Sequence, residues 1–300
     1  MKILILGGSG LVGSSIIRVS KNDHEIFAPT KSTVNLLYSS DLAEFFRHQH
    51  IDVVVNAAGL SAGIQGNMNN PVKLMLTNSK IINTVLETCH QFEIPRVLNF
   101  ASACIYPISS MSNSKPDDLG AGSIEKTSEK YAYTKIYGIK LVESYRHQFN
   151  HNWSTIIPSN IYGPNDWHHG ENGHVIPMMV EKIHRAISMN ASEVIFWGTG
   201  NAMRSFLHVD DLASAVWQLI DSNLKLDNIF NVSGGEELTI LQLAKLIAAE
   251  LGYSGKVLFD SSKPEGVKKK RLDDELIRAL GWRPNIPIQK GIQEYIKLRF

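Results

Sequence analysis

The chain has 300 residues, a length typical of about two domains, and it can bury a core that needs no disulfide or metal to hold it together. Hydrophobic residues (43%) and charged residues (20%) occur in ordinary globular proportions, which argues against disorder. The formal net charge is only +1. We therefore expect neither nucleic acid nor an anionic membrane as a partner.

The cysteine content and the length of the apolar runs indicate the cellular compartment of the protein. Cys89 and Cys104 are the two cysteines, too few for a disulfide framework, and they favour a reducing compartment. The most apolar runs, such as residues 51–60, are far shorter than the roughly 20 residues of a transmembrane helix. The N-terminus has one basic residue and a brief apolar run that ends in glycines, unlike a secretory signal. We expect a soluble, cytoplasmic protein.

The first half alternates short apolar runs with amphipathic helical stretches. Strands are expected at residues 3–6, 24–28, 52–56, 96–100 and 153–157, and helices at residues 11–20, 39–50, 72–92 and 128–150. This alternation predicts an α/β fold, a doubly wound parallel sheet of the Rossmann type. After Tyr162 the order becomes less regular: residues 163–173 are expected to form a loop and residues 242–251 a helix.

A glycine-rich segment joins the first strand to the first helix. It consists of Gly7, Gly8, Ser9, Gly10, Leu11, Val12 and Gly13. Glycines let a backbone turn tightly against a pyrophosphate, which then lies at the positive end of the helix. A plain turn has the same composition, but the position after strand one of an α/β pattern favours a dinucleotide site.

The end of the second strand discriminates between dinucleotides. Enzymes that use NAD usually have Asp or Glu there to hold the ribose 2′-hydroxyl. Here Pro29, Thr30 and Lys31 follow the strand, with no acid. Lys31 can meet a 2′-phosphate, so we predict NADP as the cofactor.

A small-residue segment follows the third strand. It consists of Asn56, Ala57, Ala58 and Gly59. Such residues let the backbone lie against a cofactor, although tight packing between a strand and a helix gives the same composition.

Tyr131 and Lys135 form a Tyr-x-x-x-Lys pair on a predicted helix, where positions i and i+4 share a face. A nearby ammonium lowers the pKa of a tyrosine, which makes Tyr131 a usable proton donor or acceptor. Tyr133 and Tyr137 lack a lysine four residues later. Ser102, just after the fourth strand, is placed to hydrogen-bond a substrate oxygen.

In this order, the glycine turn, the serine and the Tyr-x-x-x-Lys pair resemble the extended short-chain dehydrogenase/reductase superfamily, over essentially the whole chain. The resemblance implies a Rossmann domain, a smaller α/β C-terminal domain for the substrate, and usually a nucleotide sugar as that substrate. Residues 206–211 resemble the segment where the chain returns to the first domain. The expected NADP-binding domain comprises residues 1–162 and 205–230, and the expected substrate domain residues 163–204 and 231–300.

Several stretches also resemble the GDP-L-fucose synthase branch of that superfamily. These are residues 102–107, 131–141, 158–164, 172–177, 197–204 and 259–264. The branch implies an NADPH-dependent enzyme that epimerises C3 and C5 of GDP-4-keto-6-deoxy-D-mannose and reduces C4 to give GDP-L-fucose. By this resemblance Cys104 is the base and His174 the acid, a pair able to move protons near pH 7. Ser102 and Tyr131 would hold the keto oxygen.

The same resemblance implies further binding residues. For the cofactor they are Asn78, Tyr131, Lys135, Pro158, Asn160, Ile161 and His174. For the substrate they are Ser102, Ala103, Cys104, Lys182, Trp197, Arg204 and Lys263. Three positions depart from the branch: Lys182 replaces an arginine and loses its bidentate fork, Ala103 replaces a serine, and Ser9 occupies a usually basic position.

Two other functions fit the same motifs. One is an NADPH-dependent 4-reductase of another nucleotide-linked 4-keto sugar in surface-polysaccharide biosynthesis, with or without epimerisation. The other is a non-catalytic NADP-sensing protein, because a fold alone determines no function. The complete set of Ser102, Tyr131 and Lys135 argues against the sensor.

No metal is expected. His168, His169 and Glu171 lie together in the predicted loop, but adjacent histidines are poorly arranged for a shared metal and the carbonyl chemistry needs none. The resemblance implies a homodimer, formed through the predicted helices at residues 72–92 and 128–150.

Overall fold

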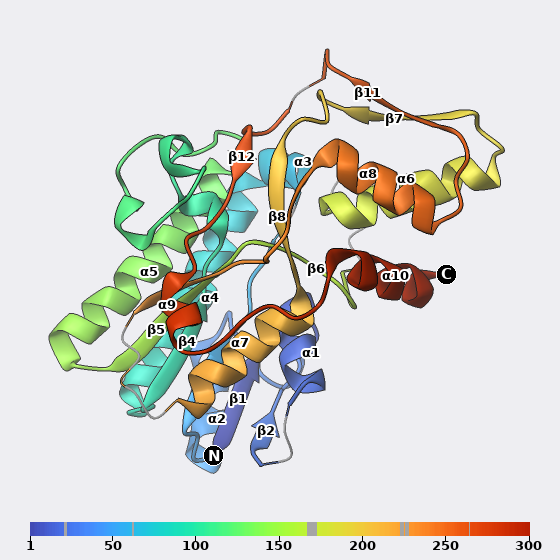
Figure 1. The fold of residues 1–300 in the computed structure, drawn as a ribbon. Helices are drawn as coiled ribbons and strands as arrows, with labels where there is room; N and C mark the ends of the chain where they lie inside the picture. The colour runs from blue at the N-terminus through green and yellow to red at the C-terminus, as the bar shows by residue number, and fades with distance from the viewer. Residues whose placement is uncertain (21–22, 62, 167–172, 223–224, 226–227, 264) are drawn as a thin grey trace.

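A computed structural model describes residues 1–20, 23–61, 63–166, 173–222, 225, 228–263 and 265–300. Its main sheet has six strands in the order β2-β1-β3-β4-β5-β9 (Figure 1), every neighbouring pair being parallel. The strands are β1 (Lys2–Leu6), β2 (Glu25–Phe27), β3 (Val53–Asn56), β4 (Arg96–Phe100), β5 (Asn152–Pro158) and β9 (Ile229–Val232).

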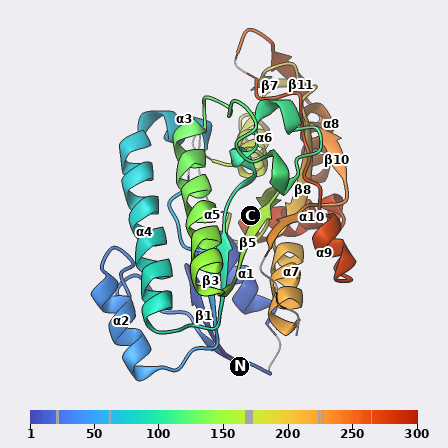
Figure 2. The same cartoon turned by 90° about the vertical axis from the view of Figure 1, so that its left-hand side faces the viewer.

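Helices cover both faces of this sheet because its strands are apolar on both sides. In β1, Leu4 and Leu6 pack into the core beneath α2 (Ser39–His48), α4 (Pro71–Gln91) and α5 (Glu129–Phe149). Ile3 and Ile5 pack into the opposite core, with α1 (Leu11–Arg18) and α7 (Val209–Asp221). Figure 2 shows α4 and α5 running side by side over the first face. The predicted doubly wound parallel sheet is confirmed.

The strand order reverses beside β1. The next strand in sequence, β2, lies on one side of β1, and β3 lies on the other. In open α/β sheets, ligands bind in the crevice at the carboxyl ends of the strands where this reversal occurs. The glycine turn at residues 7–13 lies at that edge, directly after β1.

The sixth strand, β9, was not predicted. Its four residues include Asn231, whose side chain breaks the apolar pattern of a buried strand. In the fold, Tyr106 donates a hydrogen bond to Asn231 Oδ1 (2.7 Å), and Asn231 Nδ2 donates to the Ser114 carbonyl (3.0 Å). These distant partners satisfy the amide, so a polar residue is tolerated in the sheet.

The second part of the chain has a core of its own. The parallel pair β7 (Glu193–Trp197) and β11 (Lys256–Asp260) packs with the helices α6 (Val175–Ser188), α8 (Ile240–Glu250) and α10 (Ile288–Arg299). These elements lie above and to the right of the main sheet in Figure 1. The predicted helix at residues 242–251 begins two residues earlier, because Thr239 and Gln242 form a capping box.

A small sheet lies between the two parts. In it, β8 (Met203–His208) pairs with β6 (Asn160–Tyr162), β10 (Glu237–Thr239) and β12 (Lys269–Lys270). The shorter elements are the helices α3 (Ile64–Asn69) and α9 (Glu275–Ala279) and the 3-10 helices η1 (Ala103–Ile105), η2 (Ile108–Ser110) and η3 (Pro116–Asp118). Within the described residues, no helix is both long and apolar enough to cross a membrane.

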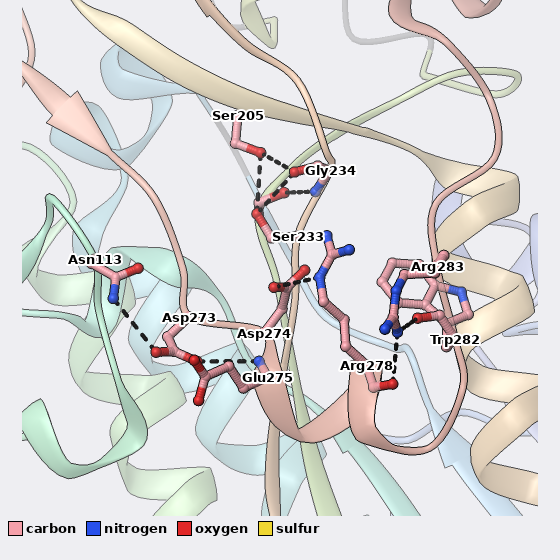
Figure 3. Close-up of polar contacts among 11 residues, drawn as sticks. Asn113, Ser205, Ser233, Gly234, Asp273, Asp274, Glu275, Arg278, Trp282 and Arg283 are labelled. Atoms are coloured by element: carbon pink, nitrogen blue, oxygen red, sulfur yellow. Dashed lines mark hydrogen bonds and ion pairs between the residues drawn. The ribbon is translucent and has the colours of Figure 1, made fainter.

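Between β9 and β10 the chain passes close to β8 at Gly234. The Ser205 hydroxyl donates to the Gly234 carbonyl (2.9 Å) and lies 3.1 Å from the Ser233 hydroxyl (Figure 3). A Cβ on Gly234 would lie 1.8 Å from the Phe206 carbonyl oxygen. Only glycine therefore lets the two backbones approach this closely.

We expect Gly234→Ala to lower the free energy of unfolding by about 3 kcal/mol, because the added methyl group must displace the backbone of β8. Gly235→Ala is the matched control, since its Cβ would have no neighbour closer than 3.6 Å. Urea unfolding of both variants measures the difference. Equal stabilities would contradict the close approach.

Candidate functional site

The glycine turn is folded tightly against the backbone that follows β3. Gly7 has φ of +83°, and a Cβ there would lie 2.8 Å from the Ala58 nitrogen. A Cβ on Gly13 would lie 2.2 Å from the Gly7 carbonyl oxygen. Gly10 is the N-cap of α1 and offers no side chain to the first N–H groups of the helix. The turn therefore fits a pyrophosphate, which those N–H groups can bind.

The rest of the turn completes this frame. Gly8 faces the end of β2, where its Cβ would lie 3.0 Å from that of Ala28. Ser9 is exposed, Leu11 begins α1, and Val12 packs against the core of the main sheet.

The segment after β3 is held by two side-chain amides. Asn56 donates to Asn99 on the neighbouring strand (2.8 Å). Asn78 both accepts from the Leu60 nitrogen (2.8 Å) and donates to its carbonyl (2.9 Å). A Cβ on Gly59 would lie 3.2 Å from Asn78 Oδ1 and 3.4 Å from Lys135 Nζ. Asn78, predicted to bind the cofactor, thus positions the backbone at residues 59–60.

The remaining predicted cofactor residues lie at other points of the same edge. Lys31 is exposed in the turn after β2, where Val34 donates its N–H to Thr30 (2.9 Å). Pro158 ends β5. Asn160 donates to the Ser205 carbonyl (2.9 Å) and so ties β6 to β8, while Ile161 packs against the core of the main sheet.

Four of the predicted catalytic residues meet beyond β4. The Ser102 side chain lies close enough to Cys104 and Tyr131 to act on both, and it opposes the effect of burial on the pKa of each. Lys135 Nζ donates to the Phe100 carbonyl (3.2 Å) and lies 5.7 Å from the centre of the Tyr131 ring. The i, i+4 spacing on α5 places Tyr131 and Lys135 on one face, and η1 turns Cys104 toward them. The predicted Ser102, Cys104, Tyr131 and Lys135 therefore form one cluster.

Burial dominates the electrostatics of this cluster. It raises the pKa of the Cys104 thiol, which is only 7% exposed, against the opposing effects of Lys270, Ser102 and Lys135. It lowers the pKa of Lys135 to about 8. The pKa of Tyr131 is raised, by burial first and then by Cys104. The expectation of a lowered tyrosine pKa is therefore wrong. Removal from water disfavours the charged phenolate, and this effect decides the direction of the shift.

Lys270 is a neighbour of the cluster that the sequence did not single out. It lies on β12 opposite Arg204 of β8, and its ammonium is the largest of the influences that lower the pKa of Cys104. Burial and Arg204 lower the pKa of Lys270 itself, while Cys104 and Glu125 raise it. Residues 268–270 are three consecutive lysines, ordinarily a solvated run, and only the strand pairing distinguishes Lys270.

The predicted substrate residues are spread along the second part of the chain. Arg204 donates to the carbonyls of Met203 and Val267 (2.8 Å each). Burial lowers its pKa, and Glu125 and Glu265 oppose this effect. Ala103 is buried beside Cys104 in η1.

The other three lie around the β7–β11 pair. Trp197 is 54% exposed at the end of β7. Lys263 is exposed just beyond β11, where its nitrogen donates to the Asp260 carbonyl (3.2 Å). Trp197 pairs with Asp260, so Trp197 and Lys263 lie at the same end of this sheet. Lys182 donates to the Ile195 carbonyl (2.5 Å) and lies over the Phe196 ring.

His174 is the N-cap of α6. Its Nδ1 lies 2.9 Å from Oδ1 of Asp166, which is completely buried. Burial lowers the pKa of His174, but the hydrogen bond and charge of Asp166 outweigh that effect and raise it above its usual value. Sequence reasoning missed Asp166 because it is one polar residue among many in a predicted loop.

The candidate metal residues His168, His169 and Glu171 lie outside the described residues. Among the residues that the structure describes, no cluster of His, Cys, Asp and Glu side chains is arranged to hold a metal.

A parallel sheet with this glycine turn and a Tyr-x-x-x-Lys pair at its carboxyl edge defines a dinucleotide-dependent dehydrogenase or reductase. The model of the NAD dependent epimerase/dehydratase family matches residues 3–233, and the chain belongs to that family.

Its relatives are similar along nearly their whole lengths. The GDP-L-fucose synthase of Escherichia coli (strain K12) is 37% identical, over 97% of this chain and 94% of its own. The GDP-L-colitose synthase of Yersinia pseudotuberculosis is 35% identical, over 98% and 96%. The structure of MlghC, a GDP-mannoheptose C4 reductase from Campylobacter jejuni with NADP bound, is 25% identical, with a TM-score of 0.84 over 99% and 98%.

We expect Lys270→Met to raise the pKa of the Cys104 thiol, because it removes the strongest of the influences that favour the thiolate. The pH dependence of Cys104 alkylation by iodoacetamide, followed by peptide mass spectrometry, measures this. Lys269→Met is the matched control, since Lys269 forms an ion pair with Glu237 (3.1 Å) instead. An identical profile for Lys270→Met and the native protein would contradict the assignment.

Proposed function

We propose that this protein is an NADPH-dependent 3,5-epimerase/4-reductase that converts GDP-4-keto-6-deoxy-D-mannose to GDP-L-fucose. The observation that supports this most strongly is the position of Ser102 beside both Cys104 and Tyr131, where it opposes the effect of burial on the pKa of each. This joins a thiol suited to epimerisation to a phenol suited to reduction. The full-length similarity to a GDP-L-fucose synthase agrees with both activities.

Epimerisation uses the acidity of carbons next to a ketone. With the C4 oxygen held by Ser102 and Tyr131, Cys104 as the thiolate takes a proton from C3 or C5, and the oxygen holds the resulting negative charge. His174 returns a proton to the opposite face of the same carbon. The raised pKa of His174 favours its protonated, proton-donating form.

Reduction uses the same oxygen. Bound NADPH supplies the hydride for C4. Tyr131 protonates the oxygen that becomes a hydroxyl, and its raised pKa keeps it in the protonated form that this step requires. Lys135, on the same helix face, holds the nicotinamide ribose. Binding of the keto oxygen by Ser102 and Tyr131 therefore serves both reactions.

The cofactor proposal rests on the turn and on Lys31. The open N-terminus of α1 fits the pyrophosphate, and Lys31 after β2 meets the 2′-phosphate. MlghC, which has a similar fold, was solved with NADP bound.

The nucleotide end of the substrate lies against the second part of the chain in this proposal. Trp197 stacks on the guanine, while Lys263 and Arg204 meet the diphosphate, Arg204 in bidentate fashion. Lys182 adds a charge without the fork of an arginine. Residues 1–162 and 205–230 then form the cofactor domain, and residues 163–204 and 231–300 the substrate domain.

Assembly and location complete the proposal. The protein is a cytoplasmic homodimer paired through α4 and α5, the helices that lie side by side in Figure 2. Exposed apolar side chains on both helices, Val72 and Leu76 on α4 and Tyr133 and Tyr137 on α5, support this surface.

A second candidate is the reduction of a different GDP-linked 4-keto sugar. The sequence similarity to a GDP-L-colitose synthase and the similar fold of a GDP-mannoheptose C4 reductase favour it, since both of these proteins are named for GDP-linked sugars. In this case the same Tyr131, Lys135 and Ser102 would act on the C4 oxygen.

Oxidation of NADPH and NADH with a panel of GDP- and UDP-linked 4-keto sugars tests the function. We expect the highest kcat/KM for GDP-4-keto-6-deoxy-D-mannose with NADPH, and a lower KM for NADPH than for NADH. A higher kcat/KM for another sugar would favour the second candidate. Lack of turnover with every sugar, despite NADPH binding, would instead favour a non-catalytic sensor.

We expect Cys104→Ser to stop exchange at C3 and C5 in heavy water, because a hydroxyl is a far weaker acid than a thiol and does not form the anion that acts as the base. Reduction of an already epimerised ketone should continue. Proton NMR of the sugar follows the exchange, and NADPH absorbance follows the reduction. Cys89→Ala is the matched control, since Cys89 is a buried residue of α4 that faces the core. Normal exchange in Cys104→Ser would remove the thiol from the role of base.

A further inference from the structure

Asp166 is a completely buried carboxylate whose position is determined by three separate parts of the fold. Its own N–H donates to the Gly163 carbonyl (3.1 Å). The preceding Asn165, with φ of +71°, donates to the Ser14 hydroxyl on α1 (2.8 Å). Tyr295 on α10 donates to the Asp166 carbonyl (2.9 Å). A carboxylate taken out of water in this way needs a strong partner.

His174 is that partner. The 2.9 Å contact joins Nδ1 of the imidazole to Oδ1 of Asp166. A carboxylate accepts hydrogen bonds only, so Nδ1 carries a proton and donates it to Asp166. The other ring nitrogen, Nε2, is then the one through which His174 can give a proton to another molecule. The side chain is 32% exposed, so the ring is accessible as well as anchored.

Asp166 and burial act on this imidazole in opposite directions, and the two effects of Asp166 together exceed the effect of burial. Of the charged groups, Asp166 alone is identified as a cause of the raised pKa of His174 in the described structure. Tyr295 faces Asp166 from α10, and Arg299 and Glu181 act on Tyr295 with opposite signs. The hydrogen bond to Asp166 and its negative charge therefore favour the protonated form of His174, which holds the transferable proton.

We propose that Asp166 is the positioning residue of the epimerase, which fixes the His174 ring with Nδ1 turned inward and Nε2 directed at the substrate carbon. The inference rests on the proposed function for its catalytic consequence. In each turnover His174 gives the Nε2 proton to the carbanion carbon, and the C–H bond forms as the N–H bond breaks. The neutral ring then regains a proton from water, and Asp166 keeps the Nδ1–H in place throughout.

Direct observation of His174 tests the pair without any substrate. In ¹⁵N NMR of the native protein, with the resonance identified by its loss in His174→Gln, we expect a proton on Nδ1 in the neutral ring and a pKa above the ordinary histidine value. A neutral ring protonated on Nε2, or an ordinary pKa, would overturn the proposal even if no Asp166 variant could be purified.

Asp166→Asn tests the consequence, because it keeps the size of the side chain and removes its charge. The pKa of His174 should fall, which moves the basic limb of the pH profile for exchange at C3 and C5 to lower pH. At pH 8 that exchange should fall by about 100-fold, the scale of lost general acid catalysis. Reduction of an already epimerised ketone should fall far less. An unchanged limb, or an equal loss of both reactions at all pH values, would overturn the proposal.

Asp211→Asn is the matched control. Asp211 is also a buried carboxylate, but it accepts from the Asn285 and Ile286 nitrogens (3.0 and 2.9 Å). Loss of the Asp211 charge should lower the melting temperature and leave the pKa of His174 unchanged. A shift of that pKa in Asp211→Asn would contradict the assignment of the effect to Asp166. If His174 titrates as proposed but the native protein exchanges no sugar hydrogen, the proposed function fails and the positioning role of Asp166 stands.

Discussion

Parallel pairing of β1, β3, β4 and β5 is the constraint on which the rest of the molecule depends. It brings the carboxyl ends of all these strands to one edge, so the glycine turn after β1, the small residues after β3 and Ser102 after β4 become neighbours. The turn can close only because Gly7 and Gly13 have no Cβ to occupy the space taken by backbone atoms. The cofactor surface is thus a direct consequence of strand register.

Burial makes this edge chemically selective. Desolvation acts against the thiolate of Cys104 and the phenolate of Tyr131, and it also makes Lys135 easier to deprotonate. The proposed reactions need a thiol that can lose a proton and a phenol that retains one. The ammonium groups of Lys270 and Lys135 oppose the effect of desolvation on the pKa of Cys104, and Lys270 has the larger effect. In contrast, Cys104 adds to the effect of burial and raises the pKa of Tyr131 further. The lysines therefore favour loss of the proton from Cys104, the proposed base, and have no such effect on Tyr131, the proposed proton donor.

The second part of the chain contributes more than a place for a nucleotide. Through β12 it presents Lys270 to the cluster beyond β4, and through α6 and α10 it holds His174 and the backbone of Asp166. The proposed base, Cys104, and the proposed acid, His174, thus come from different parts of the chain.

Local pattern alone determined much of this protein. Apolar runs and helical periodicity predicted five strands of the main sheet, and the glycine turn, Ser102, Tyr131 and Lys135 were recognisable because each depends on spacing within a few residues. Tertiary structure alone decided what depends on distant neighbours: β9, whose Asn231 is satisfied by Tyr106 and Ser114; Lys270, distinguished from two adjacent lysines by the register of β12 with β8; and Asp166. The sign of the Tyr131 pKa shift belongs to the second group, because spacing specifies which charges are near but not how much water the fold removes.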